Sequence, residues 1–438
     1  MCWLVQTAMS WQNVPDEPRL PFGTDLLSNP NEPVGVPFHL RVGKGFVLGS
    51  IPRVKGHESF GDVPNPGGAS QPFQPTQRRT RAKRSTRMEE EKRMQLLAFL
   101  DATTVEDVVR HKNAAPESLL VLESTMTVEQ TLRQLAKKEV LSAPLIIGPD
   151  LETLRADGVE VPEGVTKTSP WYIRNHMVDV GIVDMGTLLM ALAETIKKWQ
   201  QEHGGTLPEL QDDIGPRFLS KTLDDMPTWC RDGRFIYESE MKNTSLRKLM
   251  ELFLKSLSNG VTNHRAVILN GEGMAVGVLS QSDLVQFLYA NRSKFEGVTN
   301  ETVEKSGMAQ SPVSVVCADA PAIEAFREME ELKLSGLAVV DKLGGRLVAN
   351  ISENDFRGLS PEALFDCLSM PVTEYLSKEN GEESLVPITC KSNHKVEDVM
   401  RRMIDSHVHR VYLVDSKYDP IGVVTATDVL RYFLVDSN

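Results

Sequence analysis

Residues 407–430 read HVHRVYLVDSKYDPIGVVTATDVL, and this stretch decides how the rest of the chain is interpreted. Two apolar segments, HVHRVYLV and GVVT, flank a polar turn, which predicts two paired strands. The second segment leads into ATDVL, a polar start that is typical of a helix. Alternation along the first strand puts His407 and His409 on one face, which suits a metal ion, whereas Arg410 suits an anion. The stretch alone leaves both interpretations open.

The same pattern occurs four times and predicts a structural repeat. Each copy contains an amphipathic helix, an apolar strand, a turn, a further strand and a second helix. The strand cores begin at 140, 262, 333 and 407 and read VLSAPLII, TNHRAVIL, KLSGLAVV and HVHRVYLV. The strands that follow begin at 181, 277, 349 and 422 and read GIVDMGTLL, GVLSQSDLV, ANISENDFR and GVVTATDVL. We therefore expect an α+β fold built from four similar units.

The repeats predict the domain boundaries. We expect copy one at 88–195, copy two at 211–292, copy three at 300–360 and copy four at 364–438. Copy one has an extra segment at about 149–177, whose Pro, Gly and acidic residues predict a surface loop inserted in a hairpin. Residues 1–87 are rich in Pro and Gly without an apolar period, which predicts a disordered tail. Its basic run RRTRAKRSTR, residues 78–87, suits either a solvated linker or a nuclear-localisation or anion-docking signal.

The composition is typical of an intracellular globular protein, with 438 residues, 41% apolar content and a net charge of −12. The five cysteines are scattered without a CxxC motif, so neither a disulfide framework nor a thiolate zinc site is indicated. No apolar run approaches the roughly 18 residues that span a bilayer. We expect a soluble protein of the cytoplasm, the nucleus or both, with no membrane partner. The acidic body of the chain argues against nucleic acid as a partner.

A turn motif closes the second of these strands in each copy. In copies two, three and four a Ser or Thr is followed three residues later by Asp, as in Ser280 and Asp283. This is the spacing of a capping box, a structural role that needs no ligand. Alternatively, the carboxylate accepts hydrogen bonds from ribose hydroxyls while the helix N-terminus and nearby cations hold a phosphate. Copy one departs from the motif, because Asp184 stands at the hydroxyl position and Thr187 at the carboxylate position.

A His-Arg pair stands at the strand core only in the even copies, as His264-Arg265 and His409-Arg410. A strand start has no structural need for Arg in every second copy, so we expect the even copies to supply phosphate ligands to a shared centre. Solvated charges at a strand edge are the alternative. The candidate ligand-binding residues are Asp428, Thr425, Thr427, His409, Arg410, Asp283, Ser280, Ser282, His264, Arg265, Asp355 and Ser352.

The odd copies carry small residues at the same place. We align Ser142-Ala143 of copy one and Ser335-Gly336 of copy three with the two His-Arg pairs. Copy two has Thr262 where copy four has His407, so His407 is expected to lie outside the site.

The β-α-β-β-α unit that ends in Ser/Thr, two residues and Asp resembles the cystathionine-β-synthase (CBS) domain. That domain works in intimate pairs, so four copies resemble two Bateman-type pairs. The segments VLSAPLII, NHRAVIL, GLAVVD and VHRVYLVD are similar to strands of the γ regulatory subunits of AMP-activated and plant SNF-type protein kinases. The resemblance covers about residues 103–436. It implies that AMP, ADP or ATP binds between repeats, with the even-copy His-Arg residues reaching its phosphates, and that kinase catalytic and scaffold subunits are partners.

Catalysis by this chain is not expected. The sequence contains no GxxxxGK[ST], GxSxG or HExxH and no kinase HRD and DFG pair, and the repeats use nearly all the ordered chain. No cofactor is expected, and a metal ion at His407 and His409 would lack a third ligand. Two functions remain open. One is an adenine-nucleotide-sensing regulatory subunit of a kinase, and the other is a CBS-fold adaptor or structural protein without tight nucleotide binding.

Overall fold

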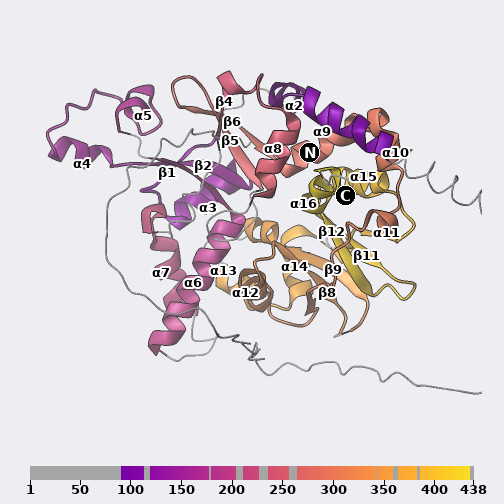
Figure 1. Cartoon of the computed structure of the whole chain (residues 1–438). Helices are drawn as coiled ribbons and strands as arrows, with labels where there is room; N and C mark the ends of the chain where they lie inside the picture. The colour runs from indigo at the N-terminus through magenta and orange to yellow at the C-terminus, as the bar shows by residue number, and fades with distance from the viewer. Residues whose placement is uncertain are drawn as a thin grey trace, which may run out of the picture. The chain divides into compact units, whose positions relative to one another are not determined.

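The computed structural model describes residues 90–112, 119–176, 179–203, 211–225, 235–255, 264–342, 344–358, 364–381 and 385–434. The predicted tail, residues 1–87, and its basic run lie outside these ranges. Within them the chain has an α+β fold with four three-stranded sheets, one for each copy of the repeat (Figure 1). The predicted α+β fold of four repeated units is therefore confirmed, with one difference in the last helix of copy three.

The elements follow the same order in each copy. Copy one has β1 (Leu122–Glu123), α3 (Val128–Lys137), β2 (Ser142–Ile147), β3 (Asp179–Asp184) and α6 (Met185–His203). Copy two has β4 (Phe235–Tyr237), α8 (Leu246–Leu254), β5 (Arg265–Leu269), β6 (Ala275–Ser280) and α9 (Gln281–Ala290). Copy three has β7 (Val315–Cys317), α12 (Ala322–Leu332), β8 (Gly336–Val340), β9 (Leu347–Ser352) and the 3₁₀ helix η6 (Glu353–Gly358). Copy four has β10 (Thr389–Cys390), α15 (Val396–Asp405), β11 (Arg410–Val414), β12 (Pro420–Thr425) and α16 (Ala426–Leu434).

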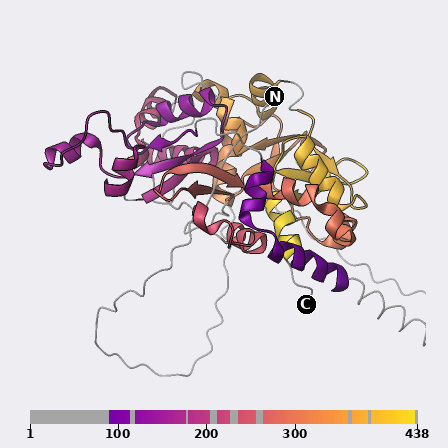
Figure 2. The same ribbon diagram turned by 90° about the horizontal axis from the view of Figure 1, so that it is seen from above.

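Further helices join the copies. A helix over 90–102 precedes α2 (Val105–Lys112), and the other connecting helices are α7 (Gln211–Ser220), α10 (Glu296–Thr299), α11 (Val303–Ser306), α13 (Leu364–Leu368) and α14 (Val372–Asn380). The helix over 90–102 lies against α16, which lies more than 300 residues further along the chain (Figures 1 and 2). Arg93 donates a hydrogen bond to the backbone oxygen of Tyr432 at 2.8 Å and stacks over its ring at 4.5 Å.

The sheet topology is identical in the four copies. The short first strand pairs in parallel with the second, and the second pairs antiparallel with the third. Parallel neighbours need a crossover connection, which the first helix of each copy supplies. That helix is amphipathic: α15 buries Val396, Val399, Met400 and Met403 at helical spacing. The hairpin of the second and third strands then delivers the turn motif to the start of the last helix.

The sheets pack in two pairs, as expected for Bateman-type modules. Val180 of β3 shares a core with Val267 and Leu269 of β5, which joins copies one and two. Ala338 of β8 shares a core with Tyr412 of β11, which joins copies three and four. The cores that join the two pairs are built mainly from helices. They place α6 with α12 and α9 with α15, so copy one meets copy three and copy two meets copy four.

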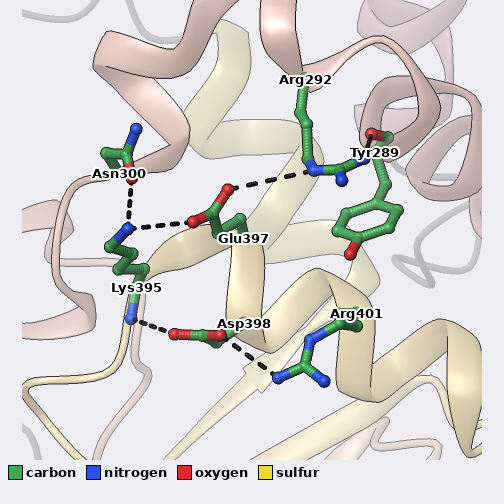
Figure 3. A network of polar contacts seen from close by, with 7 residues as sticks. All are labelled: Tyr289, Arg292, Asn300, Lys395, Glu397, Asp398 and Arg401. Atoms are coloured by element: carbon green, nitrogen blue, oxygen red, sulfur yellow. Dashed lines mark hydrogen bonds and ion pairs between the residues drawn. The ribbon is translucent and has the colours of Figure 1, made fainter.

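A polar network also ties copy two and the connecting helix α10 to copy four (Figure 3). Lys395, just before α15, donates to Asn300 Oδ1 at 2.5 Å and to Glu397 Oε1 at 3.1 Å. Glu397 lies 4.0 Å from Arg292, whose guanidinium stacks 4.2 Å from the ring centroid of Tyr289. These contacts are partly exposed, so each contributes about 1 kcal/mol or less and chiefly fixes the orientation of the helices.

The segment between β2 and β3 of copy one contains two helices rather than only loop. They are α4 (Leu151–Ala156) and α5 (Pro170–His176). Asp150 caps α4 by accepting a hydrogen bond from the backbone of Thr153 at 2.7 Å. Leu154, Tyr172 and Ile173 form a small core with Ile146 of β2. The inserted segment is therefore folded onto the sheet of its own copy.

The last helix of copy three differs from the expected one. The polar start after β9 was expected to begin a helix like those of the other copies, but the structure contains the short 3₁₀ helix η6 there. Gly358 ends it, and the sequence reaches Pro361 three residues later. Both residues oppose an extended α-helix, Gly through backbone entropy and Pro through its missing N–H.

Candidate functional site

A cavity of about 450 Å³ is lined by residues from all four copies. Nine of the twelve predicted ligand-binding residues line it. These are His264, Arg265, Ser280, Ser282, His409, Arg410, Thr425, Thr427 and Asp428. Asp283, Ser352 and Asp355 do not line this cavity. The two His-Arg pairs, which are far apart in the sequence, therefore meet at one centre.

The strand register explains why arginine occurs only in the even copies. The first residue of the second strand pairs with the hydroxyl position of the turn motif, as Ser142 with Asp184, Arg265 with Ser280, Gly336 with Ser352 and Arg410 with Thr425. Arginine and small residues therefore alternate at equivalent positions. The predicted alignment of copy one was wrong by one residue, because Ser142 and not Ala143 corresponds to the arginines. All residues of β2 are buried, so no alternation of apolar and polar residues marks its register in the sequence.

The arginine of copy two is paired with a carboxylate of copy one. Arg265 Nη1 lies 2.7 Å from Asp184 Oδ2, and the two side chains are 8% and 22% exposed. Asp184 Oδ1 accepts hydrogen bonds from the backbone and the hydroxyl of Thr187 at 2.9 and 2.8 Å. Copy one therefore keeps the hydrogen bonds across the turn, but the carboxylate and the hydroxyl have exchanged positions in the sequence. Burial acts to raise the pKa of Asp184, but Arg265 and the Thr187 hydrogen bonds outweigh it and hold this pKa below its ordinary value.

The arginine of copy four crosses onto copy three but has no carboxylate partner there. Arg410 Nη2 donates to Ser335 Oγ at 2.6 Å. Its Nη1 is buried against Gly336, where an added β-carbon would overlap it, and has no hydrogen-bond partner among the described residues. Arg410 is only 7% exposed, and the structure records no ion pair for it within the described ranges. A buried cation without a counter-ion is unfavourable, so this position favours an anion.

Glu353, the first residue of η6, adds a carboxylate to the same cavity. An added β-carbon on Gly186 would lie 2.6 Å from Glu353 Oε2 and 3.5 Å from Asp184 Oδ1, so the two carboxylates are near neighbours. Burial, followed by the charge of Asp184, raises the pKa of Glu353 to about 7, although Arg265 and Arg410 act to lower it. Sequence reasoning missed Glu353, because it lies between the two residues of the turn motif and its role depends on copy one.

The two histidines are neutral hydrogen-bonding groups rather than cations. Burial, with the charge of Arg265 next, lowers the pKa of His264 to about 4. Burial and both arginines lower the pKa of His409 to about 3. His409 Nδ1 lies 3.4 Å from Asn354 Nδ2. Each imidazole can therefore donate or accept one hydrogen bond per ring nitrogen at neutral pH.

Asp428 joins the turn motif to the cavity. Its Oδ2 accepts from the backbone and hydroxyl of Thr425 at 2.9 and 2.6 Å, which is the capping role. Its Oδ1 accepts from Gln310 Nε2 at 3.0 Å and Arg431 Nη1 at 2.9 Å. Thr427 donates to Gln281 Oε1 of copy two at 2.8 Å. One oxygen of Asp428 is thus structural, while the other binds side chains that a ligand could replace.

The other two aspartates make the same capping contacts in different surroundings. Asp283 Oδ2 accepts from the hydroxyl of Ser280 at 2.8 Å and forms an ion pair with Lys112 at 2.9 Å. Lys112 Nζ also donates to the backbone oxygen of Val278 at 2.9 Å, so the lysine lies over the turn of copy two. Asp355 Oδ2 accepts from the hydroxyl of Ser352 at 2.9 Å. The contribution of Lys112 could not be inferred from the repeat, because it comes from α2, outside the repeated unit.

The second histidine of the opening strand lies outside the cavity. His407 is exposed, has a left-handed φ of 52° and does not line the cavity. Among the residues that the structure describes, no group of three or more His, Cys, Asp or Glu could hold a metal ion. In the same ranges, no helix combines the length and apolar character needed to cross a membrane.

Comparison with known proteins shows what the chain resembles. The CBS domain family matches residues 306–362 and 384–435, within copies three and four. The γ subunit of the 5'-AMP-activated protein kinase of Saccharomyces cerevisiae is 22% identical over 341 residues, which are 78% of this chain and 92% of the relative. The SNF1-related protein kinase regulatory subunit gamma-1-like of Arabidopsis thaliana is 27% identical over 248 residues, 53% of this chain and 56% of the relative.

Among solved structures, a Methanocaldococcus jannaschii protein described as a proposed archaeal homologue of γ-AMPK matches with a TM-score of 0.48 and 18% identity, over 76% of this chain and 100% of that one. The repeat, the paired sheets and the sequence matches agree on one description. Two segments of the chain match the CBS domain, and the chain as a whole resembles the γ regulatory subunits of AMP-activated and SNF1-related protein kinases.

Proposed function

We propose that this chain is a non-catalytic regulatory subunit of a protein kinase complex and that it binds AMP, ADP or ATP in the cavity between its repeats. The observation that carries the proposal is Arg410, a buried arginine that lines the cavity without an ion-pair partner among the described residues. An anion at this position would supply the missing counter-charge. The relatives named above are kinase γ subunits, which supports the same assignment.

The two ends of a nucleotide fit different parts of the wall. In this proposal, ribose hydroxyls replace Gln310 and Arg431 at Asp428 Oδ1, because both are side chains that can move aside. The phosphate is bound by Arg410, with the neutral imidazoles of His264 and His409 as further donors. A cavity of about 450 Å³ lies within the range of roughly 300–1,000 Å³ that holds small ligands.

The charges of the cavity favour a ligand with few phosphates. Arg265 is already paired with Asp184, and Glu353 adds a second carboxylate. The cations Lys333 and Arg431 also line the cavity but are paired with Glu330 and Asp428. Arg410 is therefore the lining arginine that has no carboxylate partner among the described residues. AMP therefore suits the centre better than ATP, whose additional negative charges would face both carboxylates.

A ligand at this place can regulate because it touches both sheet pairs. Residues of copies one and two form part of the wall and residues of copies three and four form the rest. A nucleotide that prefers one packing of the pairs shifts the protein toward it, and bound kinase subunits would sense that shift. We propose that this occurs in the cytoplasm, the nucleus or both.

Calorimetric titration of the full-length chain with AMP, ADP, ATP, adenosine and S-adenosylmethionine tests the binding step. We expect AMP to bind with a micromolar dissociation constant and more tightly than ATP. Absence of binding by any nucleotide below millimolar concentration would refute the proposal. Affinity purification of the chain from its native cell tests the partner step, with kinase catalytic and scaffold subunits expected in the eluate.

The second candidate is a CBS-fold adaptor or structural protein without tight nucleotide binding. The ion pair of Lys112 with Asp283 favours it, because an internal lysine already occupies the carboxylate of copy two. The exchanged turn of copy one also lacks a ribose carboxylate. Recovery of kinase subunits from cells together with no nucleotide binding in the titration would select this candidate.

A further inference from the structure

Two charged groups of opposite sign line the cavity, and neither has an ion-pair partner among the described residues. One is the Arg410 guanidinium, whose only hydrogen bond to another copy goes to the neutral Ser335 hydroxyl. The other is the Glu353 carboxylate, for which the structure records no hydrogen bond or ion pair in the described ranges, including with Arg410. A ligand that satisfies both groups must accept a hydrogen bond from the arginine and share or donate a proton to the carboxylate.

The charged and titratable groups named here around Glu353 come from the other three copies. Asp184 approaches from β3, Arg265 from β5 and Arg410 from β11, and His264 and His409 line the same cavity. A β-carbon added to Gly186 would lie 2.6 Å from Glu353 Oε2 and 3.5 Å from Asp184 Oδ1. The distance between these two oxygens therefore cannot exceed the sum of those two distances. When two carboxylates lie this close together, the arginines lower the pKa of one of them more than the pKa of the other.

The pairing decides which of the two carboxylates keeps its charge. Asp184 has the 2.7 Å contact with Arg265 and two hydrogen bonds from Thr187, and these hold its pKa below the ordinary value. Glu353 has none of these, and burial together with the charge of Asp184 raises its pKa to about 7. The pKa values of His264 and His409, about 4 and about 3, leave both rings neutral above pH 5. Among Asp184, Glu353, His264 and His409, only Glu353 titrates near pH 7.

We infer that Glu353 is a specificity-determining residue that admits a phosphate only together with one proton, which the carboxyl and the phosphate then share. This inference rests on the proposed function, because it concerns the ligand of the same cavity. A phosphate monoester has a second pKa of about 6, so AMP and Glu353 both lie near their titration points at neutral pH. A shared proton replaces the repulsion between two anions with a charge-assisted hydrogen bond. No bond other than O–H is made or broken.

The proton also sets the preference among nucleotides. One shared proton cancels the repulsion for a monophosphate, but the further phosphates of ADP and ATP bring charge that no additional proton in the cavity offsets. Wild-type protein should therefore prefer AMP over ATP, and the preference should decrease when Glu353 cannot ionise. Glutamine is the suitable replacement, because it has the same shape and no charge.

The experiment is calorimetric titration of the full-length chain with AMP and ATP between pH 6 and 8.5, in two buffers of different ionisation enthalpy. For the wild type we expect uptake of about one proton per AMP at pH 8 and an affinity that falls about tenfold per pH unit above pH 7. In Glu353→Gln the uptake should disappear, AMP affinity at pH 8 should rise about tenfold, and the preference over ATP should shrink. Glu328→Gln is the matched control, because Glu328 also has a raised pKa but does not line the cavity, and it should behave as the wild type.

Each outcome has one meaning. AMP binding with the same affinity at pH 7.5 and 8.5, or equal proton uptake by the wild type and Glu353→Gln, overturns this inference and leaves the proposed nucleotide site intact. Failure of both proteins to bind any nucleotide at every pH overturns the proposed function and this inference with it. Thermal unfolding of Glu353→Gln checks that the variant folds, and the absence of hydrogen bonds to the Glu353 carboxylate gives no reason for it to unfold.

Discussion

The guanidinium of Arg410 occupies the space beside Gly336 that a β-carbon would need, so copy four and copy three interlock at their equivalent positions. Both residues are the first of their strands, β11 and β8. Copy four contributes the long arginine side chain, and copy three leaves space for it because Gly336 has no β-carbon. Gly336 does not have a positive φ, so glycine is needed there because of contacts: an added β-carbon would overlap the guanidinium and would also lie 2.7 Å from the backbone oxygen of Ile351 in β9.

Substitution Gly336→Ala tests this relationship. The added methyl group overlaps Arg410, which must move away from Ser335, and it also lies 2.7 Å from the backbone oxygen of Ile351. We therefore expect unfolding to become easier by about 1–3 kcal/mol. AMP affinity should also fall, because the guanidinium leaves its place in the cavity wall. Thermal unfolding and AMP titration measure the two effects. Gly271→Ala is the control, since an added β-carbon there meets no atom within 4 Å. Unchanged AMP affinity in Gly336→Ala would contradict the interlock.

Arg410→Ala should separate the phosphate from the nucleoside. Loss of the guanidinium removes a charge-assisted contact with phosphate, so AMP binding should weaken by roughly 1–3 kcal/mol while adenosine binding stays the same. Calorimetric titration with both ligands measures the difference. Arg401→Ala removes a half-exposed arginine of α15 that pairs with Asp398 instead, and it should change neither affinity. Equal losses for AMP and adenosine in Arg410→Ala would rule out the phosphate role.

Asp428→Ala should weaken adenosine and AMP to the same extent, by roughly 1–3 kcal/mol, because the carboxylate is assigned to the ribose. The substitution also removes the cap of α16, which costs about 1 kcal/mol of stability. Asp355→Ala is the matched control, because it removes the same contact with a turn hydroxyl, that of Ser352, outside the cavity. If both variants lower stability and neither lowers adenosine affinity, the motif is a cap only.

The repeat made most of the fold predictable. Apolar strand cores, turn motifs and amphipathic helices recur with so little variation that four units follow from the sequence alone. The first strands, β1, β4, β7 and β10, have only two or three residues each and give no separate signal. The slip of one residue in copy one has a physical origin as well, because every position of β2 is buried and either register would look equally apolar.

The site was predictable as far as it follows the repeat. The recurrence of His-Arg at 264 and 409 indicated a shared centre, and both pairs line the same cavity. The charges that oppose them were not predictable. Asp184 was recognised only as a departure from the motif, and Glu353 and Lys112 act through contacts between elements far apart in the sequence. Such contacts depend on how copies pack, which no single copy encodes.

The raised pKa of Glu353 also predicts a pH dependence of stability without any ligand. Its pKa is about 7 in the folded chain against an ordinary value of 4.5, so the folded state holds the proton more tightly. The stability that this proton provides is complete below about pH 4.5 and is lost as the pH rises through 7. The free energy of unfolding of Glu353→Gln minus that of the wild type should therefore increase by about 1–3 kcal/mol between pH 5 and pH 8.5. Chemical unfolding at both pH values measures this, with Glu324→Gln, an exposed glutamate of α12, as control.

The ion pair between Lys112 and Asp283 predicts how many nucleotides the chain binds. Lys112 lies over the turn of copy two and engages both Asp283 and the backbone of Val278, so that carboxylate cannot receive a ribose. We expect the wild type to bind one AMP and Lys112→Met to bind two. The variant should lose about 1–3 kcal/mol of stability, because it leaves a largely buried carboxylate without its cation. Lys198→Met removes an exposed lysine from a surface ion pair with Glu194 and should keep one site. A stoichiometry of one in a folded Lys112→Met variant would show that copy two lacks a nucleotide site even when its carboxylate is free.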